Sequence, residues 1–226
     1  ARDHFGIKPF YYAKMNGTFM YASEIKSLLR HPDFVKELNA EALKPYMTFQ
    51  YPAIGETFFK GVYKLPEGHY FTYRDGKMDI HRYYDEDFRE GKQKLGELVN
   101  SIDQTVCDSV KAHQIADVEV GSFLSSGVDS SYVAAVARPQ HTYSIGFGKG
   151  TYNESQQAGE LAELLKLNNT AESLTDEEAF AAFPRIQWHL DEPDSNPSCV
   201  PLYFLSALAA KDVKVVLSGE GADELF

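Results

Sequence analysis

The spacing of apolar residues changes near residue 90, and this change divides the chain into two regions. Before about residue 84, short apolar and aromatic runs alternate with turn residues, a pattern typical of antiparallel strands. Residues 85–92 are polar and charged, so we predict that one domain covers residues 1–88 and a second covers residues 89–226.

Two hairpins are predicted in the first region. Residues 9–22 contain Asn16-Gly17 between two apolar runs, and an Asn-Gly pair favours the positive φ angles of a tight turn. Residues 69–84 repeat the pattern around Asp75-Gly76. Between the hairpins, Ser23 is expected to cap a short helix.

The second region alternates between helical and strand-like periodicity. Apolar residues at three- and four-residue steps predict an amphipathic helix over residues 93–113. Strands are then predicted at 118–124, 142–147 and 213–217, and helices near 129–138, 154–167, 176–190 and 198–211. This alternation predicts a parallel sheet covered by helices, a doubly wound α/β fold.

Local sequence signals accompany two of these predicted helices. Thr175 and Glu178 have the spacing of a capping box ahead of the 176–190 helix. Pro184 is expected to kink or restart that helix. Asn196-Pro197 has the form of an N-cap followed by a first-turn proline.

Composition narrows the function classes. The 226-residue chain is 43% hydrophobic, enough for a packed core, and its formal net charge of -11 opposes non-specific binding to nucleic acid or anionic membranes. Cys107 and Cys199 lie far apart, so neither a disulfide framework nor a zinc site is predicted. We expect a cytoplasmic protein without a membrane span, and the start at Ala1 indicates a piece of a longer chain.

The first candidate site is the turn Ser125–Ser131, which follows a predicted strand and leads into a helix. Its hydroxyl groups, the flexible Gly127 and the helix start suit the cradling of a pyrophosphate. Asp129 would hold Mg²⁺ against the phosphates. The alternative is an ordinary N-cap cluster, because Ser and Asp are favoured at any helix start.

The second candidate site, Ser218–Glu224, follows the last predicted strand. Asp223 is a candidate second metal ligand, and Glu220 a candidate for orienting a substrate or acting as a base. The alternative is a solvated turn. Because the carboxyl ends of parallel strands gather at one edge of a sheet, both turns are expected to form one nucleotide site.

These motifs carry a family resemblance. Ser125–Ser131 resembles the Ser-Gly-Gly-x-Asp-Ser signature of the PP-loop ATP pyrophosphatases, and Ser218–Glu224 resembles the partner motif of glutamine-dependent asparagine synthetases. Residues 2–12 and 23–26 are similar to the later part of a class II, N-terminal-nucleophile glutaminase domain. Residues 191–203 match the synthetase domain, so the resemblance covers nearly the whole chain.

The resemblance implies a partial α+β glutaminase domain followed by the first part of a PP-loop ATP pyrophosphatase domain. It implies Mg²⁺ at Asp129 and Asp223, and a catalytic role for Glu220 in forming and using an acyl-adenylate. It also implies an ATP site made by Leu124, Ser125, Ser126, Gly127, Asp129, Ser130, Ser131, Ile145, Ser218 and Gly219.

The implied reaction amidates L-aspartate through β-aspartyl-AMP, with ammonia from L-glutamine, in a homodimeric enzyme. Two alternatives stay open: a relative that adenylates another carboxylate, such as a β-lactam synthetase, and a noncatalytic nucleotide-binding domain. The sequence departs from the family at Ser126, where Gly is usual, and at Asn196, where Asp is expected. The family's nucleophilic cysteine precedes this stretch, so we expect no glutamine hydrolysis by these residues alone.

Overall fold

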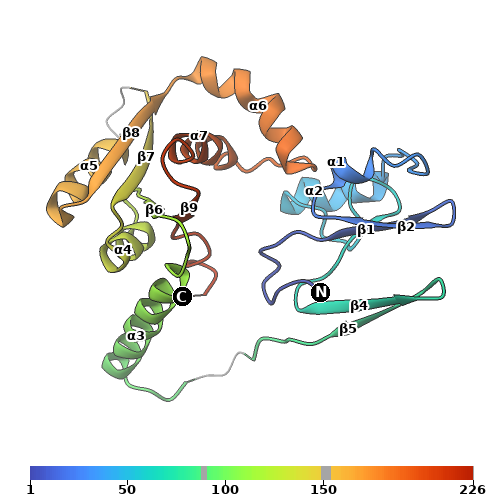
Figure 1. Cartoon of the computed structure of the whole chain (residues 1–226), viewed down its shortest axis with the longest axis horizontal. Helices are drawn as coiled ribbons and strands as arrows, with labels where there is room; N and C mark the ends of the chain where they lie inside the picture. The colour runs from blue at the N-terminus through green and yellow to red at the C-terminus, as the bar shows by residue number, and fades with distance from the viewer. Residues whose placement is uncertain (88–90, 149–153, 226) are drawn as a thin grey trace. The chain divides into compact units, whose positions relative to one another are not determined.

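The computed structural model describes residues 1–87, 91–148 and 154–225, which form two compact units (Figure 1). The first unit contains Ala1–Glu90 together with Gln187–Asn196, and the second contains Gly91–Ile186 and Pro197–Phe226. The boundary predicted between residues 88 and 89 falls outside the described residues.

The elements of the first unit are β1 (Tyr11–Met15), β2 (Thr18–Ala22), α1 (Ile25–Leu28), the 3-10 helix η1 (Ala40–Ala42), α2 (Leu43–Phe49), β3 (Val62–Lys64), β4 (His69–Arg74) and β5 (Lys77–Arg82). The elements that follow are α3 (Leu95–His113), β6 (Val120–Phe123), α4 (Val128–Ala137), β7 (His141–Phe147), α5 (Glu154–Leu165), β8 (Asn168–Leu174), α6 (Asp176–Leu190), α7 (Cys199–Ala209) and β9 (Val215–Leu217).

The first unit is built on antiparallel sheets in the order β2-β1-β3 and β4-β5. Both predicted hairpins are confirmed, and their turn residues have positive φ: 49° at Asn16, 85° at Gly17, 52° at Asp75 and 74° at Gly76. The sequence analysis did not predict η1, α2 or β3, because the region between the hairpins is aromatic without a clear period.

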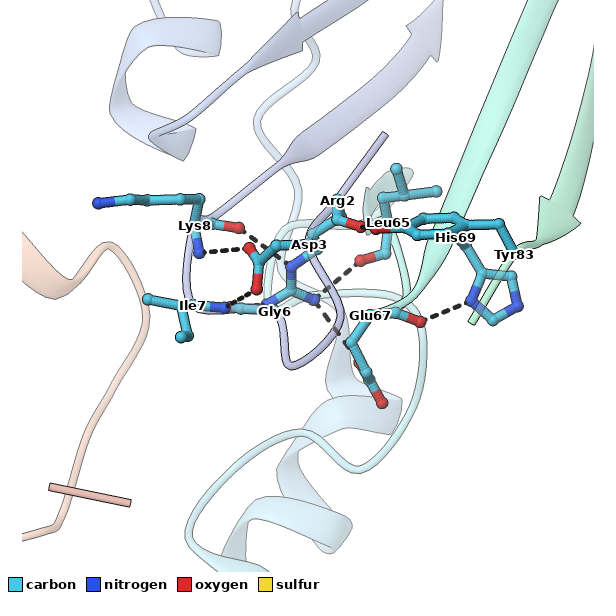
Figure 2. A network of polar contacts seen from close by, with 9 residues as sticks. All are labelled: Arg2, Asp3, Gly6, Ile7, Lys8, Leu65, Glu67, His69 and Tyr83. Carbon is cyan, nitrogen blue, oxygen red and sulfur yellow. Dashed lines mark hydrogen bonds and ion pairs between the residues drawn. The ribbon is translucent and has the colours of Figure 1, made fainter. Parts of the chain in front are cut away.

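A buried arginine fixes the start of the first unit (Figure 2). The guanidinium of Arg2, with 8% of the side chain exposed, donates hydrogen bonds to the carbonyl oxygens of Leu65 (2.8 Å), Gly6 (2.7 Å) and Lys8 (3.2 Å). It also forms an ion pair with Glu67, with 3.7 Å between Nη1 and Oε2. The planar guanidinium therefore ties residues 2–8 to the segment ahead of β4.

Replacing Arg2 with alanine should lower the free energy of unfolding of the intact protein by about 3 kcal/mol, because buried carbonyl groups lose their donors. Arg74→Ala is the matched control, since that side chain is 92% exposed and pairs with Asp75 only at the surface. Chemical denaturation of both variants tests this, and equal stability of the two would contradict the structural role of Arg2.

The N-terminal cap of α1 differs from the prediction. Glu24, not Ser23, occupies the N-cap position, and its side chain makes no capping hydrogen bond. Instead, the carboxylate of Asp191 accepts hydrogen bonds from the backbone N–H groups of Ile25 (2.7 Å) and Lys26 (3.2 Å). Ser23 was wrongly predicted as the cap because a partner so distant in sequence leaves no local signal.

The second unit contains a parallel sheet in the order β8-β7-β6-β9, whose strands lie side by side in Figure 1. Helices cover both of its faces. Leu124 packs with residues of α4 and α5, whereas the preceding residue, Phe123, packs with a cluster that includes Leu208 of α7. Consecutive residues of an extended chain point to opposite faces, so the doubly wound α/β prediction is confirmed.

One strand of this sheet was missed, and one helix start was placed wrongly. β8, with the sequence Asn-Asn-Thr-Ala-Glu-Ser-Leu, is a polar edge strand, so no apolar run or alternation marks it as a strand. Asn196 is not the N-cap of α7, because that position belongs to Ser198. The predicted capping box at the start of α6 is confirmed. The N–H of Thr175 donates to the Glu178 carboxylate, and the N–H of Glu178 donates to the Thr175 hydroxyl oxygen.

α6 runs through Pro184 as one continuous helix, so the proline does not restart it. Among the described residues, no helix combines the length and the hydropathy that crossing a membrane would require.

Candidate functional site

The two candidate turns follow neighbouring strands of the parallel sheet. β6 pairs with β9, and Ser122 lies opposite Leu217 in the register. Ser125–Ser131 follows the first of these strands, and Ser218–Glu224 follows the second. On its other side β6 pairs with β7, so the turns meet where the strand order reverses, the usual ligand position in an open α/β sheet.

The first turn is held in shape by its own serine side chains. Ser130 Oγ accepts from the backbone N–H of Ser125 (3.2 Å) and lies 2.7 Å from Ser125 Oγ. Ser125 Oγ in turn accepts from the N–H of Gly127 at 3.1 Å. Ser131 Oγ donates to the carbonyl oxygen of Gly127 (2.5 Å). The hydroxyl groups thus organise the loop around the start of α4.

The N-terminus of α4 is open for an anion. Gly127 is the N-cap and provides no side chain to bond the first N–H groups of the helix. These groups carry the positive end of the helix dipole, which favours a phosphate. Asp129 lies in the first turn of the same helix, so a carboxylate accompanies the N–H groups.

Gly219 brings the second turn against the start of α4. A Cβ atom added at Gly219 would lie 2.6 Å from the backbone N of Ser130 and 2.8 Å from the carbonyl carbon of Asp129. These distances are too short for any side chain, so only glycine permits this approach. Gly221, two residues later, has a φ of 91°, which also favours glycine.

The two turns line one cavity of roughly 360 Å³. Of the residues predicted for the site, the cavity contacts Leu124, Ser125, Gly127, Asp129, Ser130, Ile145, Ser218, Gly219, Glu220 and Asp223. Ser126 and Ser131 are not among the lining residues. Ser126 is exposed, and the hydroxyl group of Ser131 donates to the carbonyl oxygen of Gly127.

The cavity also has walls that the sequence analysis did not assign to it. Glu154 begins α5, Glu224 ends the second turn, and the start of α7 contributes Ser198, Pro201 and Leu202. The only sequence signal for the α7 wall was the family resemblance of residues 191–203. A second cavity of about 370 Å³ shares Ile145, Glu154, Ser198 and Pro201 with the first and adds Gly146, Phe147 and Pro197.

The described lining of the main cavity is acidic. It includes the carboxylates of Asp129, Glu154, Glu220, Asp223 and Glu224, and it includes no Lys, Arg or His. Within the described ranges, no group of three or more metal-binding side chains is arranged to hold an ion by itself. This donor set fits Mg²⁺, which proteins usually hold through one or two carboxylates together with substrate phosphates.

Two family models match separate parts of the chain. The asparagine synthase family model matches residues 101–226, and the glutamine amidotransferase domain model matches residues 1–84. A glutamine-hydrolysing asparagine synthetase of Bacillus subtilis is 41% identical over the whole chain, and a putative one of Mycobacterium tuberculosis is 39% identical. A putative one of Methanocaldococcus jannaschii is 31% identical.

The chain spans 36% of the Bacillus subtilis and Mycobacterium tuberculosis proteins and 46% of the Methanocaldococcus jannaschii protein. The structure of an NMN synthetase from Francisella tularensis is 21% identical in sequence, with a TM-score of 0.39. The match covers 59% of this chain and 57% of the NMN synthetase chain.

Proposed function

The chain belongs to the asparagine synthase family, and from that premise we propose that the intact protein amidates L-aspartate to L-asparagine at the expense of ATP. Ammonia comes from glutamine through the glutamine amidotransferase domain of the intact protein, to which residues 1–84 belong. The observation that carries the proposal is the convergence of an open helix N-terminus and several carboxylates on one cavity.

The first turn binds the phosphates of ATP. The N–H groups at the start of α4 and the hydroxyl groups of Ser125 and Ser130 face the pyrophosphate portion, while Ile145 and Leu124 contact the nucleoside. Ser218 and Gly219 close the nucleotide site from β9. Gly219 permits the tight approach, so the phosphate cradle depends on both turns together.

Asp129 and Asp223 would hold Mg²⁺, and a bound Mg²⁺ would neutralise charge on the phosphates. The β-carboxylate of aspartate attacks the α-phosphorus of ATP, an O–P bond forms, and pyrophosphate leaves. Glu220 lies in the same cavity and positions the acceptor during formation and use of the resulting β-aspartyl-AMP.

Amide formation then breaks the bond between the acyl carbon and the AMP oxygen. Ammonia attacks the activated carbonyl, a C–N bond forms, and AMP leaves with the former carboxylate oxygen as a proton is released. Water competes for the same carbonyl, so the reaction requires ammonia to arrive while bulk solvent is excluded.

The test is to supply the full-length protein with ATP, L-aspartate and ammonia, and to measure AMP, pyrophosphate and asparagine. We expect the three products in equal amounts and only when aspartate is present. AMP formation with another carboxylate, but not with aspartate, would move the assignment to a relative with a different acceptor. ATP binding without any AMP would overturn the enzymatic proposal.

A further inference from the structure

We propose that Ser144 is a positioning residue for the phosphate-binding turn, acting through the peptide group that opens the turn. The inference rests on the proposed function, which assigns residues 125–131 to the phosphates of ATP. Ser144 lies in β7 with 1% of its surface exposed. It is not among the described residues that line either cavity, so it acts without contacting the nucleotide.

The strand pairing between β6 and β7 stops just before the turn. Their register ends at Phe123 and Tyr143, and the N–H of Leu124 adds one further bond, to the carbonyl oxygen of Tyr143 at 2.8 Å. The carbonyl oxygen of Leu124 accepts a hydrogen bond from the side chain of Ser144, with 2.7 Å between Oγ and the carbonyl oxygen. This bond is buried, so removing the hydroxyl would leave a carbonyl group without its donor inside the protein.

The peptide group between Leu124 and Ser125 is held from both sides. Its carbonyl oxygen accepts from Ser144 in the sheet, and its N–H donates to Ser130 Oγ, in the first turn of α4, at 3.2 Å. A peptide group is planar, so a bond at each end fixes its rotation. Ser144 therefore sets how the turn leaves β6, and with it the direction of the Ser125 hydroxyl and the position of the start of α4.

A buried polar network behind the turn provides a natural comparison for Ser144. Asn169 Oδ1 lies 3.0 Å from Ser144 Oγ and 3.0 Å from Thr142 Oγ1. Thr142, which is also fully buried, reaches the carbonyl oxygen of Asn168 at 3.0 Å. Because β8 runs parallel to β7, its first residue, Asn168, lies at the opposite edge of the sheet from the turn. The two hydroxyl groups share one neighbour and differ in whether they reach the turn.

The second turn begins with a similar but weaker contact. Ser122 Oγ, which is fully buried, lies 3.3 Å from the carbonyl oxygen of Leu217, the last residue of β9. It also lies 3.1 Å from the carbonyl oxygen of Phe123, and a hydroxyl group has only one proton to donate. Ser144, with its shorter bond to the turn, is therefore the position with the larger expected effect.

The test is Ser144→Ala in the full-length protein, with the affinities for ATP and for AMP measured by calorimetric titration in the presence of Mg²⁺ and without aspartate. We expect the Kd for ATP to rise about tenfold, because the turn that faces the pyrophosphate portion loses its fixed start. The Kd for AMP should stay within about twofold, since AMP has no pyrophosphate portion to contact the turn.

Thr142→Val is the matched control, because it removes a buried hydroxyl beside Asn169 while keeping the shape of the side chain. Its Kd for ATP should stay within about twofold of the wild-type value. A merely structural role for Ser144 would weaken the binding of ATP and AMP alike, or would weaken ATP binding equally in both variants. Either result overturns the inference, as does an unchanged ATP affinity in Ser144→Ala.

Ser144→Cys fills the same space with a weaker donor, so it replaces the alanine variant if that protein does not fold. The same difference between ATP and AMP is then expected. A wild type that binds ATP but forms no AMP with aspartate overturns the proposed function and leaves the Ser144 result standing. A wild type that does not bind ATP overturns both.

Discussion

Replacing Asp129 with alanine in the full-length protein should reduce ATP-dependent asparagine formation by about a thousandfold or more, through loss of the phosphate-bound cation. Asp129 lies in the first turn of α4 and lines the cavity at the helix start where the phosphates are proposed to bind. Removing its carboxylate takes away one of the two proposed ligands of the cation that would offset the phosphate charge. Release of AMP and pyrophosphate is the measurement.

The control for this prediction is Ser126→Gly, which restores the residue usual in the family at a position outside the cavity lining. Its activity should stay close to that of the wild type. Asp129→Asn separates charge from shape, and it should resemble the alanine variant. Normal turnover in both Asp129 variants would show that this carboxylate has no part in the reaction.

Replacing Gly219 with alanine should weaken ATP binding by about tenfold to a hundredfold, as expected from about 1–3 kcal/mol of overpacking. The added methyl group would meet the backbone of Ser130 and Asp129 at 2.6–2.8 Å, so the start of α4 must shift. The phosphate-facing N–H groups would move with it. Calorimetric titration with ATP measures the loss directly, without requiring turnover.

Gly159→Ala is the matched control for this substitution. Gly159 lies within α5, and an added Cβ there meets no atom within 4 Å. Because alanine favours helix formation, this variant should keep full ATP affinity and gain up to about 1 kcal/mol of stability. Unchanged ATP affinity in the Gly219 variant would mean that the second turn does not shape the phosphate site.

The sequence predicted those parts of the fold that have a local signal. The Asn16-Gly17 turn, the strand before Ser125 and the helix after it each depend on residues within a few positions. The placement of the two polar turns at one sheet edge followed from the rule that parallel strands end together, and β6 does pair with β9.

The parts that could not be predicted depend on contacts distant in sequence. The cap of α1 comes from Asp191 rather than Ser23, and no periodicity connects these positions. β8 is an edge strand whose polar residues carry no apolar alternation. Glu154 was unassigned because it reaches the cavity only through the packing of α5 on the sheet.

The most direct test of the proposed chemistry is to follow the oxygen that leaves with AMP. L-Aspartate bearing an isotopically heavy oxygen in its β-carboxylate would be supplied with ATP and ammonia to the full-length protein, and the AMP analysed by mass spectrometry. If the carboxylate attacks the α-phosphorus, AMP acquires a single heavy oxygen from the labelled carboxylate. Unlabelled AMP, or heavy oxygen in inorganic phosphate released with ADP, would contradict adenylation of aspartate.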